Sequence, residues 1–75
     1  MDYENYKECV RELYHWTNSP FSSNFMSMLF SLISKADSEN RARLAKGFPT
    51  AVKVFEDWHN SKNETEFFSQ LEVQQ

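Results

Sequence analysis

Apolar residues return every three or four positions along most of the chain, and this spacing limits the possible folds more than any other feature of the sequence. It places large side chains along one side of an α-helix, whereas a half-buried strand alternates apolar and polar residues. In residues 2–16 the apolar positions are Tyr3, Tyr6, Val10, Leu13 and Tyr14. Because the sequence has neither strand-like alternation nor an internal repeat, the pattern predicts an all-α fold.

The strongest apolar pattern belongs to a second predicted helix, which begins near residues 19–23 and runs to about residue 36. One wide face of this helix consists of Phe21, Phe25, Met28, Leu29, Leu32, Ile33 and Ala36. Met26 and Phe30 add a second apolar face. A helix that is apolar on two sides is expected to be packed on two sides. In a chain of 75 residues, this pattern indicates a dimer.

Residues 35–49, KADSENRARLAKGFP, predict a short corner helix and the way it ends. Asp37 or Ser38 is expected to cap the start of this helix. Gly47 is expected to adopt a left-handed backbone conformation in a Schellman-type stop, because glycine has no Cβ atom to oppose it. Pro49 cannot continue the corner helix, but it suits the first turn of the next helix.

Two further helices complete the predicted fold. The inward residues of the fourth helix are Val52, Phe55 and Trp58. The last helix begins with a capping box in which Asn63 and Glu66 bond to each other's backbone N–H groups, and it extends to about residue 71. The sequence therefore predicts a compact bundle of four to five short helices. It forms a single domain over residues 1–75, with the last few residues frayed.

The chain is rich in aromatic residues, with seven Phe, two Trp and three Tyr among 75 residues. Each ring carries roughly 150–250 Å² of surface to be buried, which is more than one small domain is expected to hide. Leftover aromatic area on a small helical protein indicates a subunit or partner interface. The rings assigned to this interface are Tyr3, Tyr6, Tyr14, Trp58, Phe67 and Phe68.

Cys9 is the only cysteine, which excludes an internal disulfide and a four-cysteine zinc site. A chain without disulfides fits a reducing cytoplasm. The apolar residues are interrupted too often for a membrane span, and no basic stretch followed by an apolar run marks a signal peptide. We therefore expect a cytoplasmic protein with no metal, no cofactor and no membrane contact.

Catalysis is not expected, because the spacing of the reactive side chains does not pair them. Cys9 lies six residues before His15, so the two project from different sides of one helix. His15 and His59 each stand beside a tryptophan at a predicted helix end, where an imidazole can cover carbonyl groups. A nucleophile and its base would have to meet within hydrogen-bond reach. Cys9 is interpreted as a small, half-buried apolar residue.

A local excess of positive charge contrasts with the net charge of −3. The residues of this basic corner are Lys35, Arg41, Arg43, Lys46 and Lys53. The basic corner is either a clamp for a phosphate group or an acidic protein surface, or a solvated helix face whose cations suit the helix dipole. Duplex DNA is not expected as a partner, because an acidic chain without a second basic element is repelled by the phosphate backbone.

Several short motifs lie between Phe25 and Trp58: LF at 29–30, KADSEN at 35–40, RL at 43–44, GFP at 47–49 and V-x-x-F-x-x-W at 52–58. These motifs span about half of the chain. In them the sequence resembles small helical proteins encoded by bacteriophages and prophages. The resemblance implies a mobile genetic element in a bacterial cytoplasm, where such proteins bind and disable host or defence components. It implies no catalytic residues.

Two functions follow from these expectations. The first is a non-catalytic, homo-oligomeric protein that uses exposed aromatics and the basic corner to bind a bacterial host or defence protein. The second is an oligomeric sponge for a phosphate-bearing signalling nucleotide. In this alternative Arg41, Arg43 and Lys46 bind phosphates, and Trp58 or Tyr14 stacks on the base. Both functions predict association into a dimer or a larger assembly.

Overall fold

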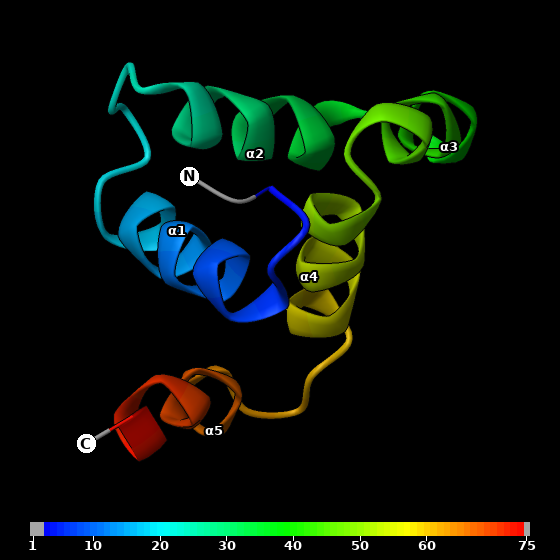
Figure 1. Cartoon of the computed structure of the whole chain (residues 1–75). Helices are drawn as coiled ribbons and strands as arrows, with labels where there is room; N and C mark the ends of the chain where they lie inside the picture. Colours follow the sequence, from blue (N-terminus) through cyan, green and yellow to red (C-terminus); the bar gives the residue numbers. More distant parts are fainter. Residues whose placement is uncertain (1–2, 75) are drawn as a thin grey trace.

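The structure is a computed structural model that describes residues 3–74, with side chains described for residues 3–71. Within this range the chain forms five α-helices, one 3-10 helix and no strand (Figure 1). The elements are α1 (Tyr6–Asn18), α2 (Phe25–Lys35), α3 (Ser38–Gly47), α4 (Pro49–His59), α5 (Glu64–Phe68) and η1 (Ser69–Gln74). The predicted all-α bundle of four to five short helices is confirmed. Of the end predicted to fray, residue 75 lies outside the described residues.

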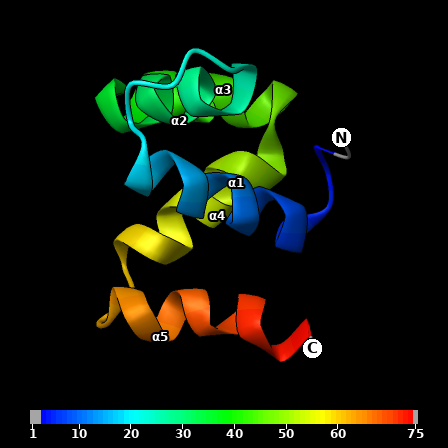
Figure 2. The ribbon, with the colours of Figure 1, turned by 90° about the vertical axis from the view of Figure 1, so that its left-hand side faces the viewer.

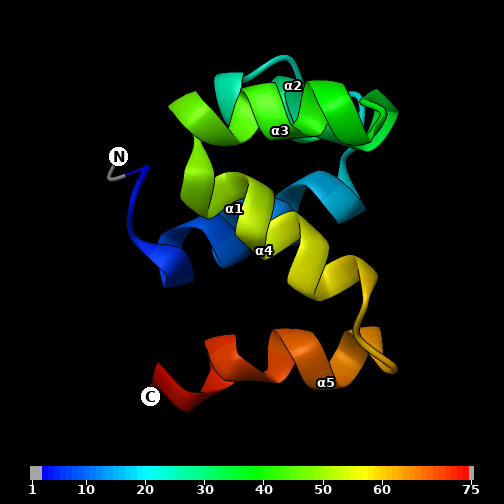
Figure 3. The ribbon, with the colours of Figure 1, turned by 90° about the vertical axis from the view of Figure 1, so that its right-hand side faces the viewer.

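The helices are stacked in three layers (Figures 2 and 3). α2 and α3 form one outer layer, α1 and α4 lie in the middle, and α5 with η1 forms the opposite outer layer. α2 therefore rests on α1 and α4 with one side, and no described element covers its other side.

Side chains cap the starts of four helices. Asn5, Asn24, Asp37 and Asn63 each accept a hydrogen bond from the backbone N–H three residues later, at 2.9, 2.8, 2.8 and 3.1 Å. Each cap satisfies one of the N–H groups that the first turn of a helix leaves unpaired. Of the two residues predicted to cap the corner helix, Asp37 and Ser38, Asp37 is the cap, and the predicted cap at Asn63 is confirmed.

The other two caps shift helix starts from their predicted positions. Asn5 precedes α1, which begins at Tyr6. Asn24 precedes α2, which begins at Phe25 and not within residues 19–23. An asparagine side chain reaches the N–H of the third helical residue at least as well as a serine does, so the hydroxyl-rich stretch before α2 remains a turn.

The core forms where α1, α2 and α4 meet. Its buried apolar residues are Cys9, Val10, Leu13, Met26, Leu29, Phe30, Ile33, Ala51, Val52, Val54, Phe55 and Phe68. Cys9 is 0% exposed and forms no disulfide, so it fills the core as a small apolar residue. Trp16 and Trp58 pack against the core, with their ring centroids 6.0 Å apart.

Gly47 does not adopt the predicted left-handed conformation. It is the last residue of α3, and no residue in the described part of the chain has a positive φ. The chain leaves the helix at Phe48, with φ −134° and ψ 63°, while the Phe48 N–H still donates to the Leu44 carbonyl at 2.8 Å. The physical reason is Pro49, because a proline disfavours helical geometry at the residue before it.

We expect Gly47→Ala to stabilise the protein by about 0.5–1 kcal/mol. Gly47 is helical, and a Cβ atom built there meets no other atom within 4 Å. Alanine fits this position and loses less backbone entropy on folding. Urea denaturation of both proteins would measure the difference. A lower stability of the variant would show that the position does need a left-handed backbone.

Tyr6 links α1 to α4. Its hydroxyl donates a hydrogen bond of 2.7 Å to Oδ2 of Asp57, which also lies 3.4 Å from Nζ of Lys53. Partial burial of the phenol, the hydrogen bond to Asp57 and the negative charge of Asp57 together raise the pKa of Tyr6. This ring, predicted as an interface aromatic, holds two core helices together.

We expect the stability that Tyr6 contributes to be present up to about pH 10 and lost as the pH rises further. Its pKa in the folded state lies above the ordinary value of 10.0, so the unfolded chain releases this proton first. Tyr6→Phe should lower the free energy of unfolding at pH 7 by about 1 kcal/mol. Its deficit relative to wild type should shrink between pH 10 and 12 as wild type loses the contribution of Tyr6.

Thermal melts across this pH range would test the expectation. Tyr14→Phe is the matched control, because it also removes one phenol hydroxyl. A deficit of Tyr6→Phe that stays constant with pH would contradict the role assigned to the bond with Asp57.

Candidate interaction surface

One side of α2 is apolar and open to solvent. The exposed fractions are 97% for Phe21, 53% for Phe25, 60% for Met28 and 53% for Leu32. These residues lie on α2 or in the turn just before it, on the side that no other described helix covers. We call the four residues the α2 outer face.

The α2 outer face corrects the predicted packing of this helix. The sequence pattern assigned Phe25, Met28 and Leu32 to the wide buried face and Met26 and Phe30 to a second face. In the structure the buried apolar residues of α2 are Met26, Leu29, Phe30 and Ile33. Both sets have helical spacing and lie side by side, but α2 has neighbours on one side only, so one set is covered. Packing on two sides is wrong for the described residues.

A cluster of three rings borders one end of the α2 outer face. Phe25 lies 5.6 Å from Tyr3 and 5.6 Å from Phe48, and Tyr3 lies 6.0 Å from Phe48, measured between ring centroids. Such edge-on and tilted contacts are favourable between aromatic rings. The cluster therefore holds the Phe25 ring in a defined position at this end of the α2 outer face.

Two connected hollows lie along the α2 outer face. The first, of about 440 Å³, extends from Phe21 past Met28 to Leu32 and Lys35. The second, of about 350 Å³, lies between α2 and α3 and is lined by Leu32, Lys35, Ala36, Asn40, Arg43 and Leu44. Leu32 and Lys35 line both hollows, so the apolar surface continues from the turn before α2 to α3.

Three cations of the basic corner, Arg41, Arg43 and Lys53, have acidic partners within the chain. Arg43 Nη2 lies 2.7 Å from Oε1 of Glu39, four residues earlier, and Lys53 Nζ lies 3.4 Å from Oδ2 of Asp57, four residues later. Such exposed pairs are weak, but their acids lower the positive potential on which a phosphate clamp depends.

Arg41 is held differently from the other basic residues. Its guanidinium lies over the Phe55 ring, 5.5 Å from the centroid, and its Nη1 is 3.9 Å from Glu56 Oε2. Arg41 therefore packs between α3 and α4, and a cation over an aromatic face is stabilising. Lys35 and Lys46 are exposed, and Lys35 lines the hollow with Arg43.

The six predicted interface aromatics divide into three groups. Tyr3 and Tyr14 are exposed, at 41% and 43%. The partly buried rings are Tyr6, Trp58 and Phe67. Phe68 is only 8% exposed and belongs to the core. The prediction that Phe68 is an exposed interface ring is therefore wrong. The physical reason is α5, which folds back and places Phe68 against Tyr14, 5.1 Å away between centroids.

Sequence reasoning missed the most exposed ring of the described chain, Phe21. The pattern included it in a helical stripe, but it lies in the turn before the Asn24 cap. Pro20 and the serines at 22 and 23 were the signal that could have identified this position, since such residues favour turns.

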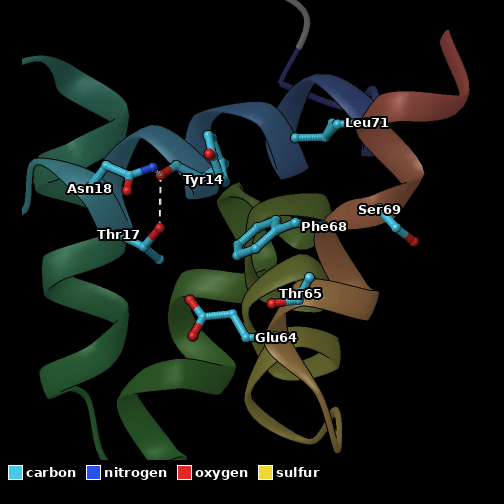
Figure 4. Close-up of a pocket in the computed structure, with 8 residues that line it drawn as sticks. All are labelled: Tyr14, Thr17, Asn18, Glu64, Thr65, Phe68, Ser69 and Leu71. Carbon is cyan, nitrogen blue, oxygen red and sulfur yellow. Dashed lines mark hydrogen bonds between the residues drawn. The ribbon is translucent and has the colours of Figure 1, made fainter.

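A separate cleft, of about 510 Å³, lies between α1 and α5, away from the two hollows along α2 (Figure 4). Tyr14 and Phe68 line it, with Glu64 as its one charged lining residue. The side chains of Thr17 and Asn18 both donate to the Tyr14 carbonyl, at 2.7 and 3.0 Å. These polar groups therefore serve the end of α1, and the lining residues include no nucleophile paired with a base.

The reactive side chains of Cys9 and His59 differ in burial. The Cys9 thiol is buried and donates to the Tyr3 carbonyl at 3.5 Å. His59 is exposed and stacks on Phe55, with 6.0 Å between centroids. Across the residues that the structure describes, no group of three or more His, Cys, Asp or Glu side chains is placed to hold a metal ion.

Comparisons of the chain with protein-family models, with curated proteins and with solved structures each gave no match. Within the described range, every helix is too short or too polar to cross a membrane. The resemblance to bacteriophage proteins stays a prediction.

We expect Met26→Ser and Met28→Ser to differ strongly in their effect on stability, although the two positions are two residues apart. Met26 is 4% exposed and Met28 is 60% exposed. Met26→Ser should cost about 2–5 kcal/mol, because it opens a cavity in the core. Met28→Ser should change the free energy of unfolding by less than about 0.5 kcal/mol. Chemical denaturation measures both free energies of unfolding. A larger loss for Met28→Ser than for Met26→Ser would show that Met28, and not Met26, faces the core.

Proposed function

We propose that the chain is a non-catalytic interaction protein that docks its α2 outer face onto another protein. The observation that carries the proposal is the exposure of Phe21, Phe25, Met28 and Leu32 on one helix, beside a core that is already closed. Taking roughly 200 Å² for each fully exposed side chain of this size, the four expose about 500 Å². This is as large as the largest apolar patches of typical monomers, which are often functional.

The free energy gained by burying the α2 outer face is consistent with reversible binding. Burying about 500 Å² of apolar surface contributes about 12 kcal/mol at 25 cal/mol per Å². Association costs on the order of 4–15 kcal/mol in lost freedom and ordered side chains. The α2 outer face thus supports binding of moderate strength, and contacts at its border add to it.

The chemistry of the border favours a protein over other partners. Residues 21–34 contain no charged residue, whereas a helix that lies on a membrane surface carries cations on its polar face. A nucleotide sponge would need phosphate-binding and stacking groups in one place. The hollow that contains Arg43 has no aromatic lining residue, and the cleft that contains Tyr14 has no arginine.

The class of partner follows from the predicted setting. If the resemblance to bacteriophage proteins holds, the partner is a bacterial host or defence protein, and the chain acts by occupying a surface of that protein. Lys35, exposed at the border of the α2 outer face, would then favour a partner with an acidic residue beside an apolar centre.

Site-specific photo-crosslinking in bacterial cells would test the proposal. A photoreactive phenylalanine analogue at position 28 should yield adducts with protein, because this side chain lies at the centre of the α2 outer face. The matched control is the same analogue at position 53, which is also exposed and helical but belongs to the basic corner. Adducts at position 53 with none at position 28 would overturn the proposal and place binding at the basic corner.

A further inference from the structure

We propose that the α2 outer face is occupied by a second copy of this chain, in a two-fold symmetric dimer. In this dimer the two α2 helices pack antiparallel, and Phe21 of each copy enters the hollow between α2 and α3 of the other. The inference rests on the proposed function, because it concerns the same surface: a second copy occupies the α2 outer face of the free chain, and a bacterial partner would have to displace it. Three observations carry it: the positions of Phe21 and the hollow, the chemistry of the hollow, and the buried area.

The first observation is that a projecting ring and a receiving hollow lie at opposite ends of one helix. The turn that carries Phe21 lies before α2, and α3 follows the other end of α2 (Figure 1). The hollow with Ala36 and Leu44 lies between the end of α2 and α3. A two-fold axis through the middle of α2, near Met28, exchanges these two ends. It also places Phe25 of one copy opposite Leu32 of the other, so the exposed residues match each other along the whole face.

The second observation is the chemistry of the hollow. Leu32, Ala36 and Leu44 supply apolar walls, and Lys35 and Arg43 supply cations at the same site. An aromatic ring suits both features, because its edge packs on aliphatic groups and its face attracts a cation. Phe21 is 97% exposed, so burial in such a hollow removes more surface from water than at any other described apolar side chain.

Charge is also compatible with self-association. The segment 21–34 is free of charged residues, so two α2 outer faces can approach without repulsion. In the antiparallel arrangement Lys35 of one copy lies near Phe21 of the other, and the two Lys35 side chains are at opposite ends of the interface. A parallel arrangement would bring these two like charges together.

The third observation is the area. About 500 Å² of apolar surface from each copy gives about 1,000 Å² in total, which is the lower limit for a specific interface. The hollow and the neighbouring polar groups add to this area. A dimer of this size is expected to be reversible, with a dissociation constant in the micromolar range.

Sedimentation equilibrium of the purified full chain would measure the dimer and its dissociation constant. Phe21→Ser should raise this constant by at least tenfold, on the order expected for an aromatic anchor that fills a pocket. Folding of this variant is preserved, because Phe21 lies outside the core. Tyr14→Ser is the control, since it removes an exposed ring from α1, away from the α2 outer face, and its constant should stay within about twofold of wild type.

Cross-linking would test the antiparallel arrangement. Two variants are purified separately and then mixed with a short bismaleimide. Ser22→Cys places a thiol beside Phe21, and Asn40→Cys places a thiol at the hollow between α2 and α3. The mixture should cross-link faster than either variant alone. The buried Cys9 gives the background in wild type. Equal rates in all three samples would overturn the arrangement.

The failure of this inference can be told apart from the failure of the proposed function. A chain that stays monomeric at millimolar concentration, or a dimer that Phe21→Ser leaves unchanged, overturns the second copy as occupant. If position 28 still forms adducts with a different protein in cells, the proposed function stands without the dimer. If position 28 forms no adduct and the chain is monomeric, both are overturned.

Discussion

The packing of α2 on α1 and α4 is the constraint on which the rest of the structure depends. These three helices enclose the core, and Phe30 and Ile33 on the inner side of α2 are 0% exposed. A chain of 75 residues has too few helices to cover both sides of a central apolar helix. Covering the inner side therefore leaves Phe21, Met28 and Leu32 in water, and the proposed function follows from this shortage of covering elements.

Features set by neighbouring residues could be predicted from the sequence. Asp37 and Asn63 were predicted to cap their helices, because a cap depends on a side chain and an N–H three residues away. The orientation of α2 could not be predicted, because two adjacent apolar stripes fit the same helical period and distant helices decide which is buried. Gly47 shows a conflict between two local rules, in which the restriction imposed by Pro49 prevailed.

The candidate site was predicted only in outline. Excess aromatic surface was expected and was assigned to Tyr3, Tyr6, Tyr14, Trp58, Phe67 and Phe68. The structure places most of the open apolar surface on α2 and the turn before it. The pairing of Arg43 with Glu39 has a helical spacing of four and could have been read from the sequence. The position of Arg41 over Phe55 could not, because it depends on how α3 crosses α4.

The hydrogen bond between Trp16 and Ser31 couples the fluorescence of Trp16 to the hollow along α2. The indole Nε1 of Trp16 donates to Oγ of Ser31 at 2.9 Å, and Ser31 lines the hollow that contains Phe21. Indole emission depends on hydrogen bonding and on the polarity around the ring. A molecule that settles in the hollow need move only one hydroxyl to shift the fluorescence of Trp16, so occupancy of this surface can be followed without an attached label.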